Sequence, residues 1–260
     1  AGNARQQLMK AKEMFLRIGI RSNGFRCPYL SISDELIHEL TLDQFDYSSN
    51  RAIFWPTTGK TQTKNNLLYE TINGFYNPED AESTLCLPWR NEEILEIPVS
   101  VPDDLLLRDG LHFSNEEVYE YFERTFEKIH SRGELFNIMF HPELATWLGE
   151  PFRRLLEKAQ NLPNEVWITQ LHEVSKWWKE KKKFWISLEK QDGLFQIQFH
   201  CSPRATLLIR GYPKNFNFLP WDKKYLVLKL EPSPFVFEKL PLIGLEPDLP
   251  EWVQPALTRL

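Results

Sequence analysis

Two short segments of the sequence contain side chains that could take part in a reaction. The first, Gly-Phe-Arg-Cys-Pro-Tyr at residues 24–29, is a predicted sharp turn with Arg26 at its centre, and a guanidinium there could orient a carboxylate. The second, at 138–143, is a predicted buried strand that ends on His141, with Pro142 stopping the strand and exposing the imidazole. A histidine pKa near about 6.5 suits proton donation to a leaving amine around neutral pH.

Other reaction chemistries have little support in the sequence. The six histidines, at 38, 112, 130, 141, 172 and 200, are never three or four residues apart, so no helical pair can converge on a metal. No Gly-x-Ser-x-Gly motif is present, and Cys27 is better interpreted as a small buried residue than as a nucleophile. We therefore expect neither covalent catalysis nor a metal site formed by this chain alone.

Composition excludes several broad classes of partner. The 260 residues include 31 Lys and Arg against 36 Asp and Glu, a formal net charge of −5, which argues against nucleic acid and anionic membranes as partners. No apolar stretch approaches the roughly 18 residues that a membrane span needs. With 42% hydrophobic and 26% charged residues, the chain has the composition of a folded globular protein.

The elements that would position these segments can be read from periodicity and capping signals. Residues 5–18 predict an opening helix, with Leu8, Ala11, Met14 or Phe15, and Ile18 on its apolar face and Gly19 as its C-cap. Residues 56–91, rich in Thr, Asn, Pro and Lys, have weak periodicity and are interpreted as a long surface insertion.

The second half of the chain predicts alternating strands and helices. A capping box at Ser114 and Glu117 begins a helix over 115–131, which Gly133 ends. The further expected elements are a strand at 135–140, a helix at 150–161, a strand at 165–169 and a helix at 171–182. Alternation of this kind favours parallel strands in an α/β layered or barrel-like fold, with the chemistry at the carboxyl ends of the strands.

From residue 184 onward the pattern becomes the two-residue alternation of antiparallel strands. An Asp192-Gly193 turn separates two such strands, and a small β module is expected. The basic run at 179–183 is interpreted as the end of a solvated helix that marks a boundary. The predicted domains are therefore residues 1–183 and 184–260.

Taken in order, the motifs resemble the polysaccharide deacetylases, the NodB-homology domain of carbohydrate esterase family 4. The likeness covers about residues 5–180 and implies an incomplete (β/α) barrel-like domain followed by the β module. His141 falls on the family's catalytic histidine. The other matching segments are 24–31 with its Arg-Cys-Pro-Tyr, 45–49, 96–100 together with Asp103 and Asp104, 165–169 and 173–178.

The resemblance implies metal-dependent hydrolysis of the N-acetyl groups of an N-acetylated polysaccharide. Water on a divalent metal, zinc or a similar ion, would attack the amide carbonyl with an aspartate as base. His141 would then protonate the leaving amine. By the same resemblance Arg26 would hold the aspartate base, the Tyr29 backbone N–H would stabilise the oxyanion, and Asp103 or, by preference, Asp104 would orient His141.

The sequence departs from the family at its first two motifs. A Thr-Phe-Asp-Asp-Gly strand end and a His-x-x-x-His pair normally precede the opening helix, and neither occurs in the 260 residues. The metal-binding motifs are thus missing from this chain, and we expect the isolated chain to be inactive. A sheet without its first strands would leave unpaired edges and exposed apolar surface, which predicts self-association.

The alternative is a catalytically silent NodB-like protein that binds carbohydrate or has a structural role. Such binding would use exposed aromatic rings. Of the tryptophans, Trp147, Trp167 and Trp177 fall on apolar faces and are expected in the core, whereas Trp55, Trp89 and Trp221 are expected to be free.

Overall fold

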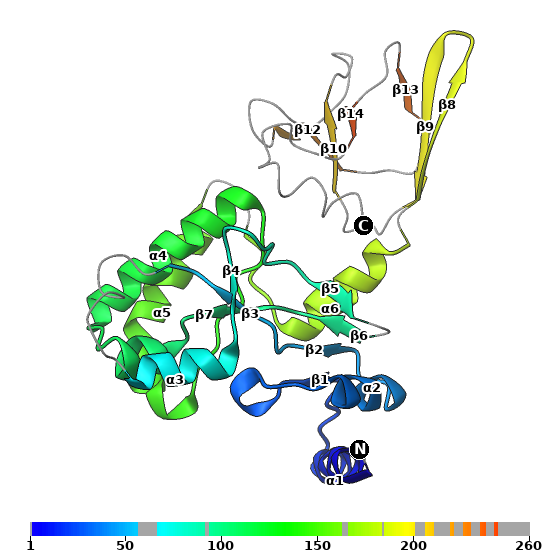
Figure 1. Ribbon diagram of the computed structural model, residues 1–260. Coiled ribbons are helices and arrows are strands. Elements are labelled where there is room, and N and C mark those ends of the chain that lie inside the picture. The colour runs from blue at the N-terminus through cyan, green and yellow to red at the C-terminus, as the bar shows by residue number, and fades with distance from the viewer. Residues whose placement is uncertain are drawn as a thin grey trace. The chain divides into compact units, whose positions relative to one another are not determined.

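The fold is described from a computed structural model of the whole chain. The structure describes residues 2–56, 67–91, 94–162, 166–183 and 185–200, and the short strands at 206–210, 219–220, 226–229, 235–237 and 242–243. The chain separates into two compact units, Ala1–Ser175 and Lys176–Leu260 (Figure 1).

The strands of the first unit form two small open sheets. One has the order β1 (Gly24–Phe25), β2 (Tyr47–Ser48), β6 (Ile94–Glu96) and β5 (Trp89–Asn91). The other has the order β4 (Glu79–Asp80), β3 (Ala52–Phe54) and β7 (Val99–Val101). All neighbouring strands are parallel except β5 and β6. The sequence prediction of a mixed α/β fold with parallel pairing is therefore confirmed.

The two sheets are successive parts of the same pair of extended segments. Only residues 49–51 separate β2 from β3, and only residues 97–98 separate β6 from β7. Between the sheets the Ile97 N–H donates to the Ser48 carbonyl at 2.8 Å and the Val99 N–H to the Arg51 carbonyl at 2.7 Å. Pro98 and Pro102 flank β7, and because proline lacks an N–H group, the ladder is interrupted there.

The prediction of a strand at 135–140 is wrong. Within this range the structure has one isolated parallel bridge, between Ile138 and Ser100. The physical reason lies in Asn137, which is buried and donates its side-chain amide to the Pro98 carbonyl at 2.7 Å and to Ser49 Oγ at 3.2 Å. Its backbone carbonyl also accepts the Ser100 N–H at 2.9 Å, so the contact of this segment with β7 combines one backbone hydrogen bond with those of a side chain. Within the described residues the sheets of this unit are small and open, and they form no closed barrel.

The strand predicted at 165–169 is also wrong where it can be seen. Residues 166–169 have no regular structure, and 163–165 lie outside the described residues. Val166 packs partly buried against the main core, but Trp167 is 53% exposed and Ile168 47% exposed.

The helices of the second half of the unit agree well with the sequence. α4 (Asn115–Arg132) begins with the predicted capping box and ends on Gly133 in the left-handed conformation, at φ 66°. α5 (Ala145–Gln160) begins five residues before the predicted start, and α6 (Leu171–Lys181) matches its prediction. α4 and α5 lie side by side (Figure 1). Their facing side chains form one core cluster, which includes Val118, Tyr121, Phe122, Leu148 and Leu155.

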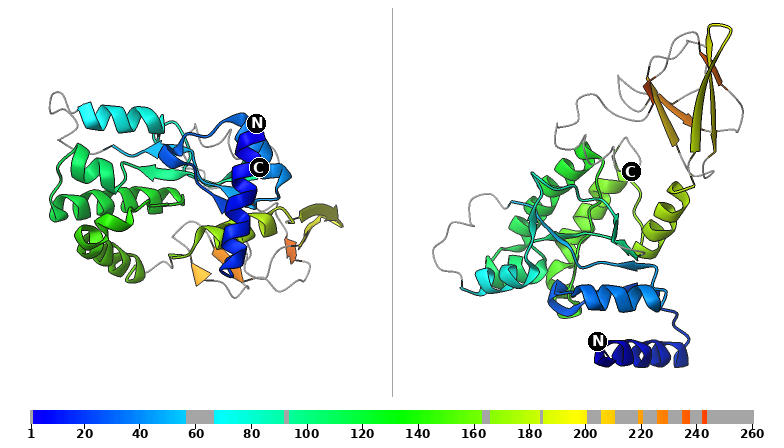
Figure 2. Two further views of the ribbon diagram at one scale, coloured as in Figure 1. Left: turned by 90° about the horizontal axis from the view of Figure 1, so that it is seen from below. Right: turned by 45° about the vertical axis from the view of Figure 1, so that its right-hand side comes forward.

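The opening helix is present, but its predicted apolar face is mostly exposed. α1 (Gly2–Arg17) is followed by Gly19 at φ 78°, with Ile20 N–H bonded to the Phe15 carbonyl at 2.9 Å, as a glycine C-cap requires. α1 packs on α2 (Asp34–Leu42) through Leu8 and lies below it in Figure 1 and in the right-hand view of Figure 2. Met14 is 68% and Ile18 69% exposed.

The interpretation of residues 56–91 as a surface insertion is wrong for the described part, 67–91. This segment contains α3 (Leu67–Tyr76), whose Ile72 and Tyr76 are buried in a cluster with Val99 and Val101 of β7. Ala81 and Cys86 are fully buried in the other large cluster. Polar residues between these positions concealed the apolar ones from a periodicity search.

The described strands of the second unit are antiparallel, as predicted. β8 (Trp185–Gln191) and β9 (Leu194–His200) form a hairpin across Asp192 and Gly193, which both have positive φ. β13 (Phe235–Phe237) continues that sheet, and the other sheet has the order β11 (Leu219–Pro220), β12 (Leu226–Lys229), β10 (Thr206–Arg210) and β14 (Leu242–Ile243).

Among the described helices, none combines the length and the apolar character that crossing a bilayer requires.

Candidate functional site

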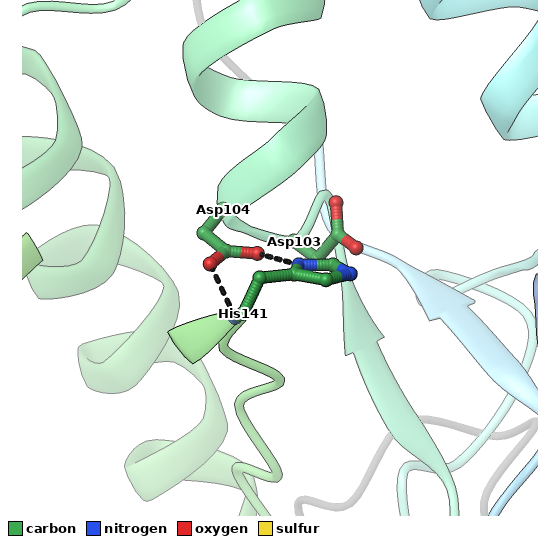
Figure 3. A group of neighbouring side chains, drawn as sticks. All are labelled: Asp103, Asp104 and His141. Atoms are coloured by element: carbon green, nitrogen blue, oxygen red, sulfur yellow. Dashed lines mark hydrogen bonds and ion pairs between the residues drawn. The ribbon is translucent and has the colours of Figure 1, made fainter. Parts of the chain in front are cut away.

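His141, Asp104 and Asp103 lie together in the first unit (Figure 3). The imidazole Nδ1 of His141 is 2.6 Å from Asp104 Oδ1, and the His141 backbone N–H donates to Asp104 Oδ2, also at 2.6 Å. Each oxygen of one carboxylate thus contacts the same residue, which fixes both the backbone and the ring of His141. The structure brings these two predicted site residues into direct contact.

The three residues are placed by the ends of neighbouring extended segments. Asp103 follows β7 and Pro102, and its Oδ1 accepts the N–H of Leu106, the first residue of the short helical turn η2 (Leu106–Gly110), at 2.9 Å. His141 follows the bridge residue Ile138 and precedes the short helix η3 (Pro142–Leu144). The cluster therefore lies at the carboxyl ends of two parallel segments, where the sequence analysis expected chemistry.

Burial and charge act in opposite directions on His141. Partial burial lowers the pKa of the imidazole. The hydrogen bond and charge of Asp104, together with the charges of Asp103 and Glu143, raise this pKa by more than burial lowers it, so the pKa of His141 lies above 6.5. Asp103 and Asp104 are 1% and 0% exposed. Burial raises the pKa of Asp103, and the Asp104 charge adds to that rise, although hydrogen bonds from Tyr76 and Leu106 oppose it.

Sequence reasoning missed Tyr76 of α3. Its hydroxyl donates to Asp103 Oδ2 at 2.6 Å, so both oxygens of Asp103 accept hydrogen bonds. Burial, together with the Asp103 carboxylate, raises the pKa of Tyr76 far above its usual value, and the hydroxyl therefore remains a donor. No signal in the sequence points to this residue, because the contact joins segments 27 positions apart.

Arg26 has neighbours other than the His141 cluster. Its Nε donates to the Ser49 carbonyl at 3.0 Å and its Nη2 to Ser49 Oγ at 2.8 Å. Burial lowers the pKa of this guanidinium, and the nearby Tyr47 and Glu96 oppose that shift. Its predicted role, to hold an aspartate base, stays a prediction.

Tyr29 contacts α3, the helix whose Tyr76 bonds Asp103. It has φ 55° and ψ 19° inside the short helix η1 (Pro28–Leu30), and its side chain is 62% exposed. Its ring centroid is 5.3 Å from that of Phe75, the neighbour of Tyr76 in sequence. The loop that contains Tyr29 therefore borders the helix that contacts Asp103, and the oxyanion role of the Tyr29 N–H stays a prediction.

Asp103, Asp104 and His141 could in principle hold a metal ion, because each offers one potential ligand atom within 4.8 Å of the others. The hydrogen bonds of the cluster argue against it. Both oxygens of Asp103 accept from Tyr76 and Leu106, while Asp104 accepts from Leu105 and from two groups of His141. A metal bound by Asp103 and Asp104 would compete with these donors for the same oxygens, and the contacts present agree with a histidine acid oriented by a carboxylate.

Two of the predictions on tryptophan are corrected. Trp55, expected to be free, is 1% exposed in the main core, whereas Trp167, expected in the core, is 53% exposed. Trp147 packs partly buried against that core. Trp221 lies outside the described residues, and Trp89 is half-buried on β5.

Comparison of the chain with family models, with curated proteins and with solved structures finds no match. The site is therefore interpreted from its own geometry and from the motifs of the sequence.

Proposed function

We propose that this chain carries the proton-donating part of a hydrolase that removes N-acetyl groups from an N-acetylated polysaccharide. The observation that supports the proposal is the contact between His141 Nδ1 and Asp104 Oδ1 at 2.6 Å. The order of the sequence motifs supplies the substrate class, and an incomplete NodB-like barrel is the fold that this proposal implies.

His141 acts in this proposal as the general acid. With Nδ1–H donated to Asp104, the other ring nitrogen, Nε2, is the one that can exchange a proton with substrate. As the C–N bond of the amide breaks, Nε2–H passes its proton to the nitrogen of the leaving amine. The raised pKa of His141 keeps a larger share of the imidazole protonated near neutral pH, and Asp104 stabilises the imidazolium without taking its proton.

The divalent metal of the proposed reaction would polarise the amide carbonyl and activate water. Every carboxylate oxygen of the cluster already accepts a hydrogen bond, so a metal there would compete with these donors. The proposal therefore requires metal ligands and an aspartate base outside the described cluster, and no step is assigned to them.

The test uses the protein from its natural source. Its intact mass and N-terminal peptides are first compared with the 30.9 kDa of this sequence. A heavier protein with an Asp-Asp strand end and a His-x-x-x-His pair before Ala1 would support the proposal. A native protein of 30.9 kDa would favour the catalytically silent carbohydrate-binding or structural alternative.

Acetate release from an N-acetylated polysaccharide is then measured for that full protein. We expect metal-dependent release that falls by about 10²–10⁴-fold in His141→Asn, the range of a lost general acid. Glu143→Gln, which removes an exposed charge near His141, is the matched control and should retain most activity. Full activity in His141→Asn would contradict the assignment of the general acid.

A further inference from the structure

Asp103 lies close to His141, yet within the described part of the chain the two side chains form neither a hydrogen bond nor an ion pair. The potential ligand atoms of Asp103, Asp104 and His141 all lie within 4.8 Å of one another, so a small movement would bring the Asp103 carboxylate onto the imidazole. Figure 3 shows this carboxylate at the end of the ring that carries Nε2, whereas Asp104 bonds Nδ1. The ring therefore has a carboxylate near each nitrogen, and one of the two carboxylates is bonded to it.

Two donors hold the Asp103 carboxylate in its present direction. Its Oδ1 accepts the Leu106 N–H at 2.9 Å, and its Oδ2 accepts the Tyr76 hydroxyl at 2.6 Å, a distance typical of a hydrogen bond to an ionised carboxylate. Asp103 is 1% exposed, so water has little access to these oxygens. The carboxylate thus depends on these two protein donors.

The Tyr76 hydroxyl is itself held in a fixed place. Tyr76 is 6% exposed, and its ring is buried in a cluster with Val99 and Val101 of β7, the strand that precedes Asp103. Burial and the Asp103 carboxylate raise the pKa of this hydroxyl far above its usual value, so it donates throughout the ordinary pH range. A rigid donor on α3 therefore restrains a carboxylate that follows β7.

The direction of Asp103 decides whether Nε2 of His141 stays open. Nδ1 of the ring contacts Asp104, and the His141 side chain is 33% exposed. A buried carboxylate that loses a donor is costly and takes another donor within reach. For Asp103 that donor is Nε2–H of the protonated ring, and a proton bonded there is withheld from any other acceptor.

We propose that Tyr76 is a positioning residue whose hydroxyl holds the Asp103 carboxylate away from Nε2 of His141, which keeps this nitrogen open to a group from outside the protein. The inference rests on the proposed function for the use of that proton, and it adds the residue that keeps the proton available. Asp104 orients the ring, and Tyr76 restrains the second carboxylate.

The charged and titratable groups that face this site come from several elements. Asp103 and Asp104 follow β7, Glu143 lies in η3, and Tyr76 and Tyr29 belong to α3 and η1. The three carboxylates all raise the pKa of the imidazole. Tyr76 acts on the imidazole through Asp103, by a hydrogen bond and not by a charge.

The experiment measures how fast diethyl pyrocarbonate, which acylates unprotonated imidazole nitrogens, modifies His141 in residues 1–260 at neutral pH. Peptide mass spectrometry reads the modification. In Tyr76→Phe we expect Asp103 to accept Nε2–H, which favours the protonated ring and slows acylation about tenfold. Tyr119→Phe is the matched control, because it removes a hydroxyl that donates to the Glu123 carboxylate on α4 at 2.9 Å, and it should leave the rate unchanged.

Two further measurements test the route through Asp103. Asp103→Asn removes the carboxylate that would capture Nε2–H, so the addition of Tyr76→Phe to this background should no longer slow acylation. In the wild type, NMR of protein with ¹⁵N-labelled histidine should show a protected Nδ1–H and a rapidly exchanging Nε2–H for His141. This last result needs no variant, and thermal unfolding midpoints verify that each variant is folded.

The proposal is overturned if Tyr76→Phe is acylated as fast as the wild type or faster, because Asp103 has then taken up a proton or the site has loosened. It is also overturned if the fall persists in the Asp103→Asn background, or if Nε2–H of the wild type is protected from exchange. No readout requires turnover, so a protein that releases no acetate can still give every expected result. Failure of the proposed hydrolysis is therefore distinguishable from failure of this inference.

Discussion

At the scale of single residues, Asp104 determines what His141 can do. It accepts from both the backbone N–H and the ring of His141, each at 2.6 Å, and is itself fully buried. Asp103 lies beside it, and its two oxygens accept hydrogen bonds from the Tyr76 hydroxyl and from the Leu106 N–H of η2. Two adjacent aspartates thus have different roles, one toward the histidine and one toward the fold.

Asp104→Asn should lower the pKa of His141 toward or below 6.5, because the largest favourable contributions to its protonated form are removed. It should also destabilise the protein by about 1–3 kcal/mol, since a buried acceptor becomes partly a donor. Titration of the imidazole resonances by NMR measures the first effect and urea unfolding the second. Glu143→Gln is the control, and its exposed charge should shift the pKa less.

The stability of the protein should depend on pH through His141. Its pKa is raised in the folded state above an unfolded value near 6.5, so the stabilisation is complete below about pH 6.5 and is lost as pH rises through the folded pKa. Urea unfolding of the wild type and His141→Asn across about pH 6–9 isolates this contribution as a difference. A difference that grew with rising pH would show that the sign is wrong.

At the scale of elements, α1 stands apart because its exposed apolar side chains have helical spacing. Ala11, Met14 and Ile18 lie on one side of the helix, whereas Leu8 and the Lys12 ammonium contact α2 and its C-cap. Exposed apolar surface of this kind favours association between molecules. The sequence predicted the same outcome from unpaired sheet edges, and β1 is indeed an edge strand.

We expect the chain to self-associate through α1, so that Ile18→Lys, which places a charge in the apolar stripe, shifts the population toward monomer. Sedimentation velocity over a range of concentrations measures the change. Gln6→Lys adds the same charge to an exposed position off the stripe and should leave association unchanged. A wild type that stayed monomeric would exclude this role of α1.

At the scale of the whole molecule, the site belongs to one unit. Among the described residues, the hydrophobic clusters around Phe122, Val99 and Leu40 are formed within Ala1–Ser175, and so are the contacts given above for the His141 cluster. α6 extends past that boundary, but its Val174 and Ser175 are buried, and Ser175 Oγ donates to the Asp46 carbonyl at 3.5 Å.

A chain of residues 1–183, which keeps α6 whole, should therefore fold and retain the His141 titration of the full chain. We expect its NMR titration midpoint to match that of residues 1–260, and its urea unfolding to remain cooperative. A chain that ends at 170 removes Val174 from the core and should be less stable by about 2–4 kcal/mol. An altered midpoint in 1–183 would show that the second unit influences the site.

Local signals in the sequence were enough to determine several elements. The capping box at Ser114, the left-handed Gly133 and the Asp192-Gly193 turn depend on neighbours within a few residues, and these predictions are confirmed. The buried strand predicted to end on His141 is reduced to one bridge at Ile138, and His141 instead precedes η3, which begins at Pro142.

Only the tertiary structure decided which side chains meet. The hydrogen bond from Tyr76 to Asp103 and that from the Asn137 amide to the Pro98 carbonyl both join distant parts of the chain. Burial likewise reversed the expectations for Trp55 and for the face of α1, because periodicity shows that a face is apolar but not whether a partner covers it.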